Sequence, residues 1–182
     1  MKYTSCVLIN VPNVGDSILF RGVTEEFGIS DLACFTFRMT GGFEASGNIM
    51  SLVNFAEEIP SNYCFARLFL NCTSLTVGPE TPALNMTEAC YQSLYNGCTN
   101  LTTIHELPAE TLAKSCYTSI FKSCNKLTRV EVAFHAWDTT CTTSWFDSVT
   151  NKTGTFVINS PTLPADFGTS KIPTGWTVIR QS

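Results

Sequence analysis

Nine cysteines are the residues of this chain whose type and spacing most directly suggest chemistry. They occupy positions 6, 34, 64, 72, 90, 98, 116, 124 and 141. From Cys64 onward, steps of eight and eighteen positions alternate, and the last step is one position shorter than eighteen. Zinc sites use close pairs of the C-x₂₋₄-C type, which a step of eight does not provide. Buried unpaired thiols, disulfides and a metal site all stay open. Buried thiols are favoured because free cysteine packs as a small apolar side chain.

Gly15-Asp16-Ser17-Ile18 is a second candidate, since it resembles the nucleophile block of GDSL-type hydrolases. A serine nucleophile needs a histidine base and a carboxylate that orients the base. That family places an aspartate three residues before the catalytic histidine, whereas Val132 stands at that distance before His135 and Thr102 before His105. The block fits a turn better. A GDSL-like hydrolase is therefore kept only as a distant alternative.

Cys141, His135 and Asp138 form a third candidate, a thiol nucleophile with its base and an orienting carboxylate. Proximity in sequence is not a hydrogen-bonded geometry, and the sequence offers no identifiable oxyanion donor. We interpret these three residues as part of a surface loop and expect no enzymatic activity.

Composition excludes several classes of partner. The chain has 182 residues, 44% of them hydrophobic and 14% charged, with 11 basic against 15 acidic side chains and a formal net charge of −4. Binding to a phosphate backbone relies on a basic surface, so nucleic acid is not an expected partner. No apolar stretch approaches the roughly 20 residues that span a bilayer, so we expect no membrane insertion. No motif suggests a cofactor or a metal.

The elements that must position these residues recur every 26 positions. Several columns keep this step: Cys64, Cys90 and Cys116; Cys72, Cys98 and Cys124; Leu75, Leu101 and Leu127; Thr76, Thr102 and Thr128; Phe69, Tyr95 and Phe121. A period of this length predicts a solenoid, in which each unit buries its apolar face against the next. Strands of adjacent coils would lie about 4.8 Å apart, which also permits disulfides between coils.

Each unit is predicted to hold one helix and one strand. In residues 108–124, Leu112, Cys116, Ile120 and Cys124 recur at four-residue spacing behind a proline, which predicts a helix. The short β-branched segments predict strands, at 75–80, 101–106 and 127–132. A step shortened by one position continues the pattern from Cys116 to Cys141.

Both ends depart from the repeat and are expected to be β caps that cover the open core. Upstream strands are predicted at 6–11, 17–23 and 34–40, and downstream strands at 153–159 and 175–179. The predicted organisation is an N-terminal β cap over 1–48, repeats over 49–150 and a C-terminal β cap over 151–182, in one continuous unit.

The repeat motif resembles the leucine-rich repeats of Bacteroides-type surface proteins (BspA-like). Residues 90–115, CYQSLYNGCTNLTTIHELPAETLAKS, carry a comparable aromatic-x-x-C-x-x-L core and an L-P-A-x-T-L segment. One unit departs from it, because VAFHAWDTT (132–140) replaces L-P-A. The resemblance implies an α/β leucine-rich-repeat solenoid and a bacterial surface or secreted interaction protein, located outside the cell or at its surface.

We therefore expect a non-enzymatic binding or adhesion module that meets a protein or glycan ligand on a host or neighbouring cell. A structural or assembly component, such as a surface-layer or phage-particle protein, is the alternative. If Leu101 and Ile104 point inward, neighbouring side chains face out. The candidate binding residues are Thr76, Thr102, His105, Thr128, Arg129 and Glu131.

Overall fold

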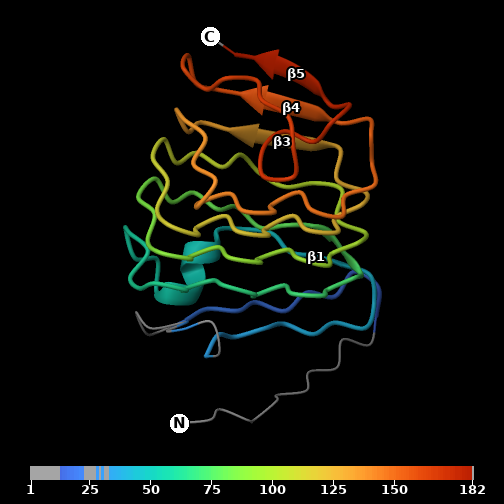
Figure 1. The fold of residues 1–182 in the computed structure, drawn as a ribbon. Helices are drawn as coiled ribbons and strands as arrows, with labels where there is room; N and C mark the ends of the chain where they lie inside the picture. Colours follow the sequence, from blue (N-terminus) through green and yellow to red (C-terminus); the bar gives the residue numbers. More distant parts are fainter. Residues whose placement is uncertain (1–12, 23–27, 29, 31–32, 182) are drawn as a thin grey trace.

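The chain winds into a stack of coils that rises from the N-terminus to the C-terminus (Figure 1). A computed structural model describes residues 13–22, 28, 30 and 33–181. The elements are β1 (Phe43–Glu44), the 3₁₀ helix η1 (Ile49–Val53), β2 (Leu75–Val77), β3 (Arg129–Val132), β4 (Thr155–Ile158) and β5 (Thr177–Arg180). All the strands lie on one side of the stack, which we call the strand side.

The strands form two small parallel sheets, β1-β2 and β3-β4-β5. Between them the segment 101–107 makes only isolated bridges, Val77 with Thr103 and Leu107 with Val132. The strands predicted at 75–80, 127–132, 153–159 and 175–179 are confirmed in shortened form as β2, β3, β4 and β5. The strand predicted over 101–106 is reduced to the bridge at Thr103.

The predicted helices do not form, so the α/β strand-plus-helix solenoid is wrong. Among the described residues η1 is the only helix. Residues 108–124 instead hold a run of overlapping turns, and the equivalent residues of neighbouring coils do the same. We call these segments the turn side: 63–72, 89–98, 115–124 and 141–149.

Backbone hydrogen bonds on the turn side alternate between two partners. The N–H groups of Cys116, Thr118 and Ile120 donate to the carbonyl three residues earlier, which closes a turn. The intervening N–H groups of Tyr117 and Ser119 donate to carbonyls of the next coil. A helix would satisfy the same groups within one segment through carbonyls four residues back. The alternation satisfies every one of these donors and ties each coil to the next.

The same cross-coil bonds show that one coil corresponds to one repeat. Phe65 donates to the Cys90 carbonyl at 2.9 Å and Tyr91 to the Cys116 carbonyl at 3.1 Å. A residue and its counterpart in the next repeat are 26 positions apart. Each of these bonds spans 25 positions, so its acceptor is the residue just before the counterpart of the donor. Tyr117 keeps this rule across the shortened step, because it donates to the Cys141 carbonyl. The missing position therefore lies outside the turn side and does not disturb its pairing.

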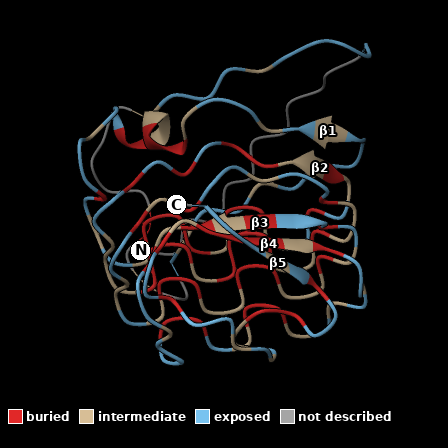
Figure 2. Cartoon of the chain, turned by 90° about the horizontal axis from the view of Figure 1, so that it is seen from above, coloured by how far each residue is buried: buried red, intermediate tan, exposed pale blue. Residues whose placement is uncertain are grey.

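The core is built from columns of rings and thiols. Phe65, Tyr91 and Tyr117 stack with centroids 5.7 and 6.2 Å apart, and Phe69, Tyr95 and Phe121 with centroids 5.8 and 6.1 Å apart. Trp145 contacts the last ring of both columns. Buried positions therefore recur from coil to coil, as the view along the stack shows (Figure 2). Stacking of the coils removes a large apolar area from contact with water. This burial is the main contribution to the stability of the stack.

The N-terminal cap differs from its prediction. The described residues within 17–23 and 34–40 contain no strand, and the segment 6–11 lies outside the described residues. Phe37 nevertheless donates its N–H to the Leu68 carbonyl at 2.7 Å and stacks on Phe69. These residues thus cover the first coil with irregular chain.

Candidate functional site

The six predicted binding residues all lie on the strand side, in three successive coils. The Thr76 hydroxyl donates to the Phe43 carbonyl at 3.2 Å, and the Thr102 hydroxyl donates to the Thr76 carbonyl at 3.0 Å. Thr102 and Thr128 are exposed, whereas Thr76 is half-buried. Two of these hydroxyls therefore bridge coils, while their methyl groups and the Thr128 side chain remain to meet a partner.

Charges gather one coil further along, on β3. The Arg129 guanidinium donates to a Glu131 carboxylate oxygen at 2.7 Å, and the Asn159 amide donates to the other at 2.8 Å. Partial burial raises the pKa of Glu131, but the hydrogen bonds from Asn159 and Arg129 outweigh it and hold that pKa below its ordinary value. Glu131 is therefore ionised at neutral pH, and half of Arg129 stays open to solvent.

Two further residues join this group that sequence reasoning missed. The Asn159 amide nitrogen also donates to Glu106 at 2.7 Å, so a single amide joins carboxylates from two other coils. Glu106 belongs to the unpaired segment 104–106, between the isolated bridges at Thr103 and Leu107. Glu106 and Asn159 are 53 positions apart, which is one more than two repeats, so the repeat period could have indicated this contact.

His105 is exposed in the same unpaired segment. It lies on the strand side with the threonines, and no hydrogen bond or ion pair joins it to the Arg129–Glu131 pair. The strand side thus presents hydroxyls, an imidazole and a half-open guanidinium. This set can bind hydroxyl-bearing or amide-bearing partners by hydrogen bonds.

Glu110, His135 and Ser160 form a second polar group that the sequence did not reveal. The His135 Nδ1 lies 2.8 Å from the Ser160 hydroxyl, and the His135 Nε2 lies 3.4 Å from a Glu110 oxygen. Ser160 is only 2% exposed, so a substrate could not reach its oxygen. The three residues are evenly spaced at close to one repeat, which could have indicated a column of side chains linking adjacent coils.

The proposed thiol site does not assemble. His135 faces Glu110 and Ser160, and Asp138 is hydrogen-bonded by Thr140 at 2.6 Å. Burial raises the pKa of the Cys141 thiol, which makes a thiolate scarce.

Asp16 belongs to the predicted turn, since its N–H donates to the Asn13 carbonyl at 3.3 Å.

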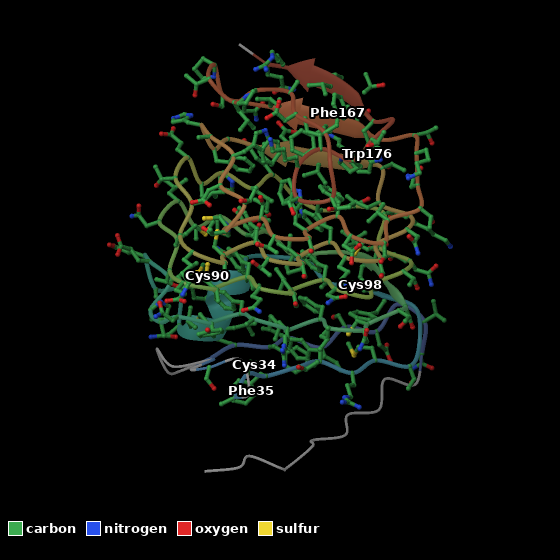
Figure 3. All side chains as sticks on the ribbon, viewed as in Figure 1. Cys34, Phe35, Cys90, Cys98, Phe167 and Trp176 are labelled. Carbon is green, nitrogen blue, oxygen red and sulfur yellow. The ribbon has the colours of Figure 1, made fainter. Side chains whose placement is uncertain are left out.

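The other thiols serve the core. The seven cysteines from Cys64 to Cys141 are free thiols, and all seven are buried. Cys90 and Cys98 lie at opposite ends of one turn-side segment (Figure 3). Cys98 donates its S–H to the Phe69 carbonyl at 3.1 Å, and Cys124 does the same to Tyr95 at 3.1 Å. Among the described residues, no group of three or more histidine, cysteine or acidic side chains could hold a metal ion.

In the part of the chain that the structure describes, no helix has the length and apolarity to cross a membrane. No protein-family model, no curated protein and no solved structure matches this chain.

Proposed function

We propose that the chain is a non-enzymatic binding module that contacts a protein or glycan through its strand side. The observation that carries this proposal is the exposure of Thr102, His105, Thr128 and Arg129 on neighbouring coils. Extended repeat surfaces of this kind are common binding faces. The resemblance of residues 90–115 to BspA-like repeats supports a surface or secreted location.

The chemistry of the face defines the interaction. Hydroxyls and one half-paired guanidinium bind mainly through hydrogen bonds and close apolar contact, so the interface is expected to be modest and only weakly dependent on salt. Sugar hydroxyls and peptide groups both provide the necessary donors and acceptors.

The test is binding of the purified chain to an array of glycans and extracellular-matrix proteins. Thr102→Glu and Arg129→Glu are each expected to weaken a reproducible signal about tenfold, because they place a carboxylate in the contact. Thr139→Glu and Lys114→Glu are matched controls, since both residues are exposed away from the strand side and should leave binding unchanged. Equal binding by all four variants would exclude this face.

Self-assembly is the second candidate function, and the free edge of β5 favours it. Among the described residues this strand pairs with β4 alone, and its Ile179 is 44% exposed. Open strand edges are templates for another strand. If the chain assembles, its mass in light scattering rises with concentration, and Ile179→Lys returns it to the monomer. A concentration-independent monomer would remove this candidate.

A further inference from the structure

Two neighbouring hollows open at a corner of the stack, between the strand side and the turn side. The first encloses about 180 Å³ and is lined by Met50, Phe55, Ala56, Glu57, Pro82 and Ala83, with Asn48 at its edge. The second encloses about 260 Å³ and is lined by Leu84, Asn85, Glu110 and Thr111. We call this region, formed by residues 55–58, 82–85 and 110–111, the acidic corner.

The two hollows adjoin each other along the stack. Ala83 lines the first and Leu84, the next residue, lines the second. The Asn85 amide donates to a Glu58 oxygen at 2.9 Å, which fixes the segment 82–85 against the preceding coil. Chain that passes over the corner would therefore meet both hollows in succession.

The acidic corner exposes large apolar side chains. Phe55 is 56% exposed and Leu84 is 63% exposed. A contiguous apolar surface between polar residues is typical of an interaction site. A space of ~150 Å³ is enough for a group the size of benzene, so each hollow has room for one side chain. The second hollow is the more polar, because Asn85, Glu110 and Thr111 line it together with Leu84.

The charge around the hollows is negative. Glu57 lines the first hollow and Glu110 lines the second, and both are exposed. A Glu110 carboxylate oxygen lies 3.4 Å from the His135 Nε2. The nearby Lys114 is already paired with Glu88 at 2.7 Å. The Arg21 guanidinium lies 5.6 Å from the Phe55 ring centre, so a cation already rests against this aromatic face.

We propose that the acidic corner binds an extended segment of a partner protein in which apolar and basic side chains alternate. Apolar side chains of the segment enter the two hollows beside Phe55 and Leu84, and its lysines or arginines meet Glu57 and Glu110. Lysine and arginine have long, flexible stems, so the basic residues on either side of an inserted apolar residue can reach the carboxylates at the rims of the hollows. This surface is separate from the strand side and does not rest on its function.

The experiment uses three labelled nine-residue peptides and fluorescence anisotropy. One peptide alternates lysine and leucine, the second has glutamate for every lysine, and the third has serine for every leucine. The lysine–leucine peptide is expected to bind at least about tenfold more tightly than either of the others, and to weaken as salt is raised.

Matched variants of the full chain locate the site. Phe55→Ser should weaken binding about tenfold, whereas Phe167→Ser should not, because Phe167 is similarly exposed (52%) but lies at the C-terminal end of the stack (Figure 3). Glu57→Lys should likewise weaken binding, whereas Glu44→Lys on β1 should leave it unchanged.

Three results would overturn the proposal. They are equal binding of the acidic peptide, equal loss in Phe167→Ser and Phe55→Ser, and self-association of the chain that Phe55→Ser abolishes, which would identify a second copy as the occupant. Arg129→Glu should leave peptide binding intact, so failure at the acidic corner and failure at the strand side are distinguished.

Discussion

At the scale of single residues, the turn side depends on left-handed backbone at every fourth position. Positive φ values between 52° and 62° recur there, at Tyr63, Arg67, Asn71, Ala89, Ser93, Ser115, Ser119, Ser123, Ser144 and Ser148. Gly97 takes the equivalent position of its coil with φ 79°. Small side chains predominate in this set, and at Gly97 the preceding coil lies close enough to restrict what the position accepts.

Gly97→Ala is expected to destabilise the chain by about 3 kcal/mol, from backbone strain and overpacking together. A Cβ at Gly97 would lie 2.3 Å from Asn71 Oδ1 and 3.3 Å from Asn71 Cα, in addition to the strain of a left-handed alanine. Gly47 has nearly the same φ, 78°, with no atom within 4 Å of its Cβ position. Gly47→Ala should therefore cost only about 1 kcal/mol. Urea unfolding of both variants measures the difference, and equal losses would show that cross-coil crowding contributes nothing.

At the scale of elements, the strands from 75 onward could largely be predicted from sequence, whereas the irregular N-terminal cap and the turn side could not. β3 and β4 consist largely of β-branched and aromatic residues, which fit a strand that is partly or wholly buried. Cys116, Ile120 and Cys124 were assigned to a helix because four-residue spacing approximates its period. A helix has 3.6 residues per turn, so a strict four-residue stripe drifts steadily around its surface. The sequence does contain evidence against a helix in this segment. Serine is a weak helix former, and it recurs at Ser115, Ser119 and Ser123.

The common side of the candidate binding residues was predictable from the repeat. Thr76, Thr102 and Thr128 share a repeat phase, which fixes them to one side of the stack whatever the other side does. The loss of pairing at 104–106 was not predictable in this way, because it depends on contacts with the two neighbouring coils.

The thiol columns predict a loss of stability in alkali. Burial raises the pKa of Cys64 to about 11 and those of Cys90 and Cys124 to about 12, from an ordinary value of 9.0. Above pH 9 these thiols ionise in the unfolded chain but stay protonated in the folded one. The contribution of these thiols to the free energy of unfolding is therefore complete below pH 9. It is lost as the pH rises toward 12, by roughly 1.4 kcal/mol per pH unit for each thiol.

Urea unfolding under reducing conditions at pH 8, 9 and 10 measures this slope. Cys90→Ala removes one ionising thiol, so its free energy of unfolding should fall less steeply with pH than that of the unaltered chain. A free energy that stays constant up to pH 10, or identical slopes for the two proteins, would contradict the explanation.

At the scale of the whole molecule, each coil is held mainly by its two neighbours. The ring columns contact one coil above and one below, and the cross-coil hydrogen bonds of the turn side repeat with the same register at Phe65 and Tyr91. Stability of such a stack is close to a sum over adjacent interfaces. One complete coil should therefore be removable without altering the contacts that remain.

Deletion of residues 90–115 tests this property. It joins Ala89 to Cys116, so Phe65 would stack on Tyr117 and donate its N–H to the Cys116 carbonyl in place of Cys90. We expect a chain that keeps its circular dichroism spectrum and unfolds cooperatively, with a lower urea m-value because less surface is buried. Deletion of 90–102 is the matched control, since half a period places strand-side residues against the turn side. If both deletions abolish folding, the coils are not interchangeable, and the stack must instead depend on contacts specific to each pair of coils.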